Sequence, residues 1–167
     1  GLTLSFFGDG ADNMVHSYLL AGATAGMHVR IACPLDYQPD ERVIADADAI
    51  AARTGGSVTI LTDPVEAASG ADVIVTDTWV SMGKEDEKAA RVAALGQYRV
   101  DADLMALAKL DAVFLHCLPA DRGYEVTSEV IDGPQSVIWD EAENRLHAQK
   151  ALLVWLLAKA DAARASA

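Results

Sequence analysis

In its last third the chain reads Ala112-Val113-Phe114-Leu115-His116-Cys117-Leu118-Pro119, an apolar run followed by an imidazole, a thiol and a proline. The run 112–115 is typical of a short buried strand, and Pro119 ends it because proline lacks the N–H that a strand ladder needs. Cys117 is therefore expected at the carboxyl end of a strand. Ligands of open α/β sheets gather at that edge, so this stretch predicts both a fold class and the place of a site.

Apolar runs of strand length alternate with helical segments along the whole chain. We expect strands at residues 2–7, 28–32, 57–61, 72–76, 112–115 and 137–139, and helices at 14–25, 40–53, 64–69, 84–95, 101–109, 126–131 and 141–160. This alternation predicts an α/β fold: an open, mostly parallel, doubly wound, Rossmann-like sheet with helices on both faces. We assign residues 1–160 to one domain and expect a frayed tail at 161–167.

Composition limits the class of partner. The chain has 167 residues, a hydrophobic fraction of 51% and a formal net charge of -12 with only 13 Lys and Arg. A surface for nucleic acid or for an anionic membrane needs clustered cations, so we expect neither partner. No transmembrane span or cleavable signal peptide is visible, which predicts a cytoplasmic protein. In that compartment Cys33 and Cys117 are expected to stay reduced.

Two more polar stretches follow expected strands, and they are Gly8-Asp9-Gly10-Ala11-Asp12-Asn13 and Asp77-Thr78-Trp79-Val80-Ser81-Met82-Gly83. The first carries two glycines of a dinucleotide fingerprint, but Asn13 stands where the third glycine belongs. The strand at 28–32 also lacks the acidic residue that binds a ribose, which disfavours nucleotide binding. The start of the following helix, with Asp12 or Asn13 as its cap, fits either a carboxylate seat or a plain capped turn.

The second stretch interleaves apolar Trp79 and Val80 with polar residues. A loop normally avoids exposing such groups, so we expect part of it to pack on a ligand or on another domain. Cys117 fits either a buried small hydrophobic residue or a proton relay. His116 is more often structural than catalytic in such a place, and a zinc site is not expected because no CxxC or HxxxH spacing occurs.

A third polar stretch, Asp140-Glu141-Ala142-Glu143-Asn144-Arg145, opens the last expected helix. Acidic residues in a first turn are favoured by the helix dipole, whereas an arginine there is not. Arg145 is therefore expected either to meet an anionic or carbonyl group of a ligand or to pair with Glu141 at helical spacing.

Together these stretches resemble landmarks of the ornithine carbamoyltransferases. The stretch from Asp77 to Gly83 resembles that family's DxWxSMG loop, His116 to Pro119 resembles its HCLP motif, and Glu141 to Arg145 resembles its third landmark. The resemblance runs in order along nearly the whole chain. It implies an ornithine-binding domain whose amino-terminal partner, the carbamoyl-phosphate domain with an SxRT motif, is absent from this chain.

The resemblance also implies roles for individual residues. Ornithine is expected to meet Asn13, Asp77, Ser81 and Met82; carbamoyl phosphate is expected to meet Cys117, Leu118 and Arg145; and Asp77, Cys117 and Arg145 are the expected catalytic residues. Asp12 stands where relatives commonly carry a second Asn, which is expected to weaken carboxylate binding slightly. No metal or organic cofactor is implied.

The implied reaction joins carbamoyl phosphate to L-ornithine, giving citrulline and phosphate in arginine biosynthesis. Because the chain opens directly on a strand, we expect it to begin within a longer enzyme and to be inactive alone. The resemblance implies a homotrimer, or a multiple of it, for the full enzyme and a monomer for the fragment. The alternatives are a carbamoyltransferase domain for another amine or amino acid, a nucleotide-binding Rossmann-like module, and an assembly unit that binds nothing itself.

Overall fold

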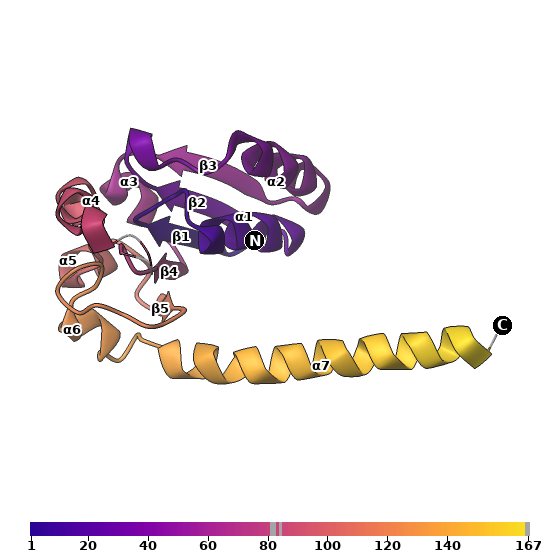
Figure 1. The fold of residues 1–167 in the computed structure, drawn as a ribbon. Coiled ribbons are helices and arrows are strands. Elements are labelled where there is room, and N and C mark those ends of the chain that lie inside the picture. Colours follow the sequence, from indigo (N-terminus) through magenta and orange to yellow (C-terminus); the bar gives the residue numbers. More distant parts are fainter. Residues whose placement is uncertain (81–82, 84, 166–167) are drawn as a thin grey trace.

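The computed structural model describes residues 1–80, 83 and 85–165. Within these residues, five strands form one parallel sheet: β1 (Thr3–Phe7), β2 (His28–Ala32), β3 (Ser57–Leu61), β4 (Val73–Thr76) and β5 (Val113–His116). Their order is β3-β2-β1-β4-β5. The chain thus moves outward from β1 to β3 and then returns to the other side of β1, as Figure 1 shows. The predicted open, doubly wound α/β sheet is confirmed.

Helices cover both faces of the sheet. Alternate strand residues point to opposite sides, so each face has side chains to bury. Leu4 and Phe6 pack in one core with α1 (Asn13–Thr24) and α2 (Glu41–Thr54). Phe7 lies in a second core on the other face, together with residues of α3 (Pro64–Ala68), α5 (Ala102–Met105) and α6 (Ser128–Ile131). Burying each phenylalanine stabilises the fold by about 1.5–3 kcal/mol.

Carboxylates cap the three helices that follow the first three strands. Asp12, Asp40 and Asp63 each accept the N–H of the residue two positions on, at 3.1 Å, 2.8 Å and 2.8 Å. Such a cap stabilises a helix by about 0.5–2 kcal/mol. Asp12 is one of the two caps that the sequence suggested for α1, and it fixes the position of Asn13 as the first helical residue.

The segment between β4 and β5 is less regular than predicted. In the described part of this segment, the 3-10 turns η2 (Glu85–Glu87) and η3 (Gly96–Tyr98) flank α4 (Lys88–Leu95), and another 3-10 turn, η1 (Leu35–Tyr37), follows β2. The helix expected at 101–109 ends at Met105, because α5 is followed by turns whose N–H groups reach back only three residues, from Leu107 to Leu104 and from Ala108 to Met105. This irregular stretch connects the two strands that end at the site.

The strand predicted at 137–139 is wrong. Ile138 instead begins α7 (Ile138–Ala165), and Ser136, just before the predicted strand, forms an isolated parallel bridge with Phe114. The acidic pair Asp140 and Glu141 lies in the first turn of α7, where the helix dipole favours negative charge. The helix also continues through residues 161–165, where the sequence predicted a frayed tail.

Helix α7 extends away from the body of the domain (Figure 1). Its segment 152–157 is Leu-Leu-Val-Trp-Leu-Leu, and these side chains are between 48% and 66% exposed. A helix that is apolar on every side is normally covered on every side. Among the described helices, none has the length and apolar composition needed to span a membrane.

The close packing of α1 on β2 gives a test of this fold. A Cβ on Gly22 would lie 2.5 Å from Cγ2 of Val29. We expect Gly22→Ala to lower the free energy of unfolding by about 1 kcal/mol, since overpacking of about 2 kcal/mol exceeds the helix-propensity gain of about 1 kcal/mol. Urea denaturation measures the change.

Gly96→Ala is the matched control, because a Cβ there meets no atom within 4 Å and its φ of -53° suits alanine. We expect a gain of about 0.4–1 kcal/mol from the stiffer unfolded chain. A Gly22→Ala variant as stable as Gly96→Ala would contradict the packing described here.

Candidate functional site

The carboxyl ends of β1, β4 and β5 lie side by side, and the strand order reverses between β1 and β4. The loops that follow the two strands at such a point turn toward opposite faces of the sheet, which leaves a crevice between them. A cavity of about 380 Å³ occupies it. Its lining comes from the start of α1, from the segments after β4 and β5, and from α7, and consists of Asp12, Asn13, Met14, Asp77, Thr78, Val80, Cys117, Leu118, Pro119, Asp121 and Arg145.

Cys117 and Asp77 form the centre of this cavity. The thiol donates to Oδ1 of Asp77 at 3.1 Å, and the N–H of Thr78 donates to the same oxygen at 2.7 Å. Burial raises the pKa of the Asp77 carboxyl, although both hydrogen bonds oppose that shift. Burial and the neighbouring Asp77 charge raise the pKa of Cys117 to about 12. Cys117 is therefore a protonated thiol near neutral pH, suited to donating a hydrogen bond rather than to nucleophilic attack.

His116 fixes the backbone beside the thiol. It is fully buried, and its Nδ1 accepts the N–H of Leu118 at 3.0 Å. Its Nε2 therefore carries the proton and faces Oε1 of buried Glu125 at 3.3 Å. Leu118 has a φ of 59°, which is strained for a leucine by about 1–2 kcal/mol and persists because the surrounding bonds hold it. This geometry gives His116 a structural role, because it holds Leu118, which lines the cavity.

Helix α7 contributes a second group of charges. Oε2 of Glu141 accepts the N–H of His116 at 2.9 Å, which ties the start of α7 to the end of β5. Burial raises the pKa of Glu141. Arg145 is exposed and lines both the main cavity and a smaller one of about 120 Å³ next to Cys117. Among the described residues Arg145 forms no ion pair, so the suggested pairing with Glu141 is not made.

The atoms offered by Asp77, His116 and Cys117 lie within 4.8 Å of one another, a spacing that could suit a metal ion. Both ring nitrogens of His116 are already hydrogen bonded, however, and a thiol with a raised pKa binds metal only after losing its proton. A metal would have to break these bonds. Cys33 and Cys117 are both free, with Cys33 buried and Cys117 half-buried.

Other atoms of the chain fill the space beside the two glycines in the turn after β1. A Cβ on Gly8, whose φ is 132°, would lie 3.4 Å from the indole nitrogen of Trp79. A Cβ on Gly10 would meet the Tyr37 carbonyl oxygen at 2.5 Å and the Cys33 sulfur at 2.7 Å. The two glycines are therefore explained by internal packing, and the nucleotide-binding alternative loses its main sequence support.

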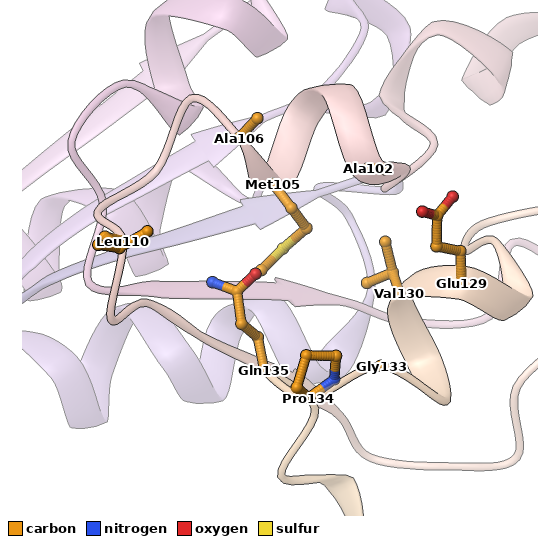
Figure 2. A pocket seen from close by; sticks show the side chains of 9 residues that line it. All are labelled: Ala102, Met105, Ala106, Leu110, Glu129, Val130, Gly133, Pro134 and Gln135. Atoms are coloured by element: carbon orange, nitrogen blue, oxygen red, sulfur yellow. The ribbon is translucent and has the colours of Figure 1, made fainter.

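A second cavity, of about 330 Å³, lies between α5, α6 and the segment that precedes β5 (Figure 2). Figure 2 shows Met105, Val130 and Gln135 directed toward it, with Glu129 as its acidic member. The amide of Gln135 is bound to the Ala112 carbonyl at 2.9 Å. This cavity holds neither a nucleophile nor paired titratable groups, so the reactive chemistry lies at the Cys117 edge.

The structure brings Asn13, Asp77, Cys117, Leu118 and Arg145 together at one cavity. Ser81 and Met82 lie outside the described residues. Sequence reasoning missed the buried acid Glu125 and the ion pair of Arg91 with Asp9. It also missed the aromatic Tyr18, whose pKa is raised by burial and by the charges of Glu141, Cys117 and Asp77. An acid between Tyr124 and Val126, next to the helix expected at 126–131, was the available signal for Glu125.

The coupling of Cys117 to Asp77 predicts the pH profile of alkylation. An ordinary thiol is mostly ionised above about pH 8.5, so its alkylation rate levels off there. The alkylation rate of Cys117 should instead keep rising with pH well beyond that value. We expect Asp77→Asn to lower the pKa of Cys117 and to speed its reaction with iodoacetamide at pH 8 about tenfold, because the neighbouring negative charge is gone. Mass spectrometry of Cys117 peptides follows the rate.

Asp132→Asn serves as the control, since that carboxylate is exposed and paired with Arg122. It should leave the Cys117 rate unchanged. An unaltered rate in Asp77→Asn would mean that Asp77 does not set the ionisation of the thiol.

Comparison with known proteins agrees with this geometry. Residues 1–156 match the family model of the aspartate/ornithine carbamoyltransferase Asp/Orn binding domain. The chain is 75% identical over 157 residues to the ornithine carbamoyltransferase of Clavibacter michiganensis subsp. michiganensis, covering 94% of this chain and 51% of that protein. The chain thus spans about half the length of the curated relatives it matches.

Solved structures give the same result. The ornithine carbamoyltransferase from Pyrococcus furiosus superposes with a TM-score of 0.87 at 52% identity, over 92% of this chain and 49% of that one. An acetylornithine transcarbamylase complexed with acetylcitrulline superposes with a TM-score of 0.79 at 35% identity, over 92% and 48%. The fold, the cavity at its strand reversal and a model match over residues 1–156 lead to one assignment: the chain belongs to the aspartate/ornithine carbamoyltransferase family, as its Asp/Orn binding domain.

Proposed function

We propose that this chain is the L-ornithine-binding half of an ornithine carbamoyltransferase and that it is inactive until joined to a carbamoyl-phosphate domain. The observation that carries the proposal is the Cys117–Asp77 pair, 3.1 Å apart, in a cavity that also holds Asn13 and Arg145. Relatives named ornithine carbamoyltransferase, at up to 75% identity, support ornithine as the substrate.

Ornithine carries two ammonium groups and one carboxylate, and the charges of the cavity suit it. Asn13 at the start of α1 is the proposed partner of the α-carboxylate and amino end, where free helix N–H groups favour an anion. Asp77 is the proposed partner of the side-chain amine. Ser81 and Met82 are assigned to the same substrate from their place in the Asp77–Gly83 motif alone.

The reaction requires the δ-ammonium to lose a proton before its nitrogen attacks the carbamoyl carbon. Such an amine has a pKa of roughly 10. A carboxylate alone raises that pKa, so exclusion of water and the nearby Arg145 cation are the proposed counterweights. Cys117 shares the amine with Asp77, and the Leu118 carbonyl together with Arg145 faces the carbamoyl group. The step needs no metal or organic cofactor because the phosphate leaving group already activates the carbon.

Carbamoyl phosphate needs cations that this cavity lacks. Arg145 is the single Lys or Arg among its described lining residues, alongside Asp12, Asp77 and Asp121. A phosphate group is normally held by several cationic or N–H donors. We therefore assign phosphate binding and the departure of phosphate to an amino-terminal domain, with residues 1–160 forming the ornithine domain.

A second candidate substrate is an acylated ornithine or another amine. It is favoured by the 35% identity to the acetylornithine transcarbamylase, which superposes over 92% of this chain. Under either substrate the place of the protein is a cytoplasmic step of amino-acid biosynthesis, and for ornithine it is the citrulline-forming step toward arginine.

The deciding experiment measures citrulline from carbamoyl phosphate and L-ornithine, with this chain alone and with the amino-terminal half of a relative added or fused. We expect product only with both halves. Activity of the chain alone would mean that residues 1–167 hold a complete phosphate site. Replacing L-ornithine by N-acetyl-L-ornithine in the fused protein separates the two candidate substrates, since the true one should react faster by at least about a hundredfold.

The full enzyme is proposed to be a homotrimer or a multiple of it, and the isolated chain a monomer. The net charge of -12 keeps copies of the chain apart. Sedimentation velocity from low to high micromolar concentration, at low salt, should give one slow species. A sedimentation coefficient that rises with concentration would instead assign the exposed 152–157 segment of α7 to self-association.

A further inference from the structure

Arg91 of α4 does not line the cavity. It contacts two segments of the chain, and each of them forms one wall of the cavity. Its Nε donates to the carbonyl oxygen of Trp79, in the segment after β4. Its Nη2 donates to the carboxylate of Asp9, in the turn after β1. The side chains of Arg91 and Asp9 are each only 4% exposed.

Each contact reaches a cavity wall through the backbone. Trp79 stands between Thr78 and Val80, which both line the cavity. The other carboxylate oxygen of Asp9 accepts the N–H of Ala11 at 2.9 Å, and Ala11 precedes the lining residues at the start of α1. One guanidinium thus joins the Thr78 wall to the wall at the start of α1.

Neighbouring groups leave Arg91 little freedom. The ring of Tyr37 lies 5.2 Å from its guanidinium carbon, and the Tyr37 carbonyl packs against Gly10. Glu87, the last residue of η2, approaches to 3.5 Å from Nη1 but is 60% exposed. A planar guanidinium presents separate donors in fixed directions, which a lysine ammonium does not. Lysine could keep the charge opposite Asp9, but it could not also reach the Trp79 carbonyl in the same geometry.

We propose that Arg91 is a positioning residue that holds the Thr78 wall and the wall at the start of α1 in one arrangement, and so sets the affinity for the amino-acid substrate. The claim about affinity rests on the proposed function, whereas the coupling of the two walls does not. Arg91 touches neither substrate nor reacting atoms, because it acts only through Trp79 and Asp9.

The coupling is tested without ligand by amide hydrogen exchange, comparing the wild-type chain with Arg91→Lys. We expect the amides of both Ala11 and Val80 to exchange about tenfold faster in Arg91→Lys. A factor of about ten is what the loss of one charge-assisted hydrogen bond produces. Arg30→Gln is the matched control, because Arg30 also joins main-chain carbonyls, those of Ala67 and Ser69, remote from the cavity. A change at one wall only, or at neither, overturns the coupling.

Affinity is tested by titration calorimetry with L-ornithine. We expect the Kd to rise about tenfold in Arg91→Lys and to stay constant in Arg30→Gln. Gly22→Ala is the stability control, since it weakens the fold without touching the cavity and should keep the wild-type Kd. An equal Kd in wild type and Arg91→Lys overturns the role in affinity.

Two further outcomes can be distinguished from a failure of the proposed coupling. If the wild-type chain gives no binding heat with ornithine, the proposed function fails for the isolated chain, and the exchange data still decide the coupling. If circular dichroism shows that Arg91→Lys does not fold, Asp9→Asn takes its place. That variant keeps the shape of the side chain while removing the charge, and the same paired change in exchange at Ala11 and Val80 is expected.

Discussion

The whole site depends on one topological constraint, which is that all five described strands run parallel. Parallel strands end at the same edge of a sheet, and the order β3-β2-β1-β4-β5 reverses direction beside β1. The segments after β1, β4 and β5 therefore converge without any helix lying between them. Residues as distant in sequence as Asn13, Asp77 and Cys117 reach one cavity for this reason. Glu141 then binds the start of α7 to the end of β5 and adds Arg145 to the rim.

Convergence at this edge also concentrates acidic groups that are partly removed from water. Burial raises the pKa values of Asp77 and Glu141. A carboxyl whose pKa is raised on folding favours the folded state only while it is protonated, and this contribution is lost as the pH rises through the folded pKa. Above those folded pKa values the ligand-free cavity is therefore destabilised by its own carboxylates. A cationic ligand offsets that cost, which makes an amine a fitting occupant on electrostatic grounds alone.

The sequence predicted most of the fold because its strands are short apolar runs bounded by turn residues. Residues 28–32 and 57–61 form strands with the predicted bounds, and the cap at Asp12 was one of two that were suggested. The strand predicted at 137–139 failed because three apolar residues suit a strand and a helix start equally, and the acids of the next turn favour the helix. Arg91 was not predictable, since it lies in a charged helical segment that reads as solvent-exposed. Only the packing of Tyr37 and Trp79 around it reveals its burial.

The division of the proposed enzyme into two halves follows from opposite electrostatic requirements. Binding an ammonium requires a negative field, which the acids lining this cavity supply, whereas holding a phosphate requires clustered cations. If both sets of groups stood permanently in one cavity, Asp77 would pair with those cations and neither substrate would meet a free partner. With the cations on a separate domain, as proposed, the two sets would stay apart until substrates lie between them. The raised pKa values of Asp77 and Glu141 fit half of such a site, because burial outweighs the charge of Arg145, which lowers the pKa of Glu141.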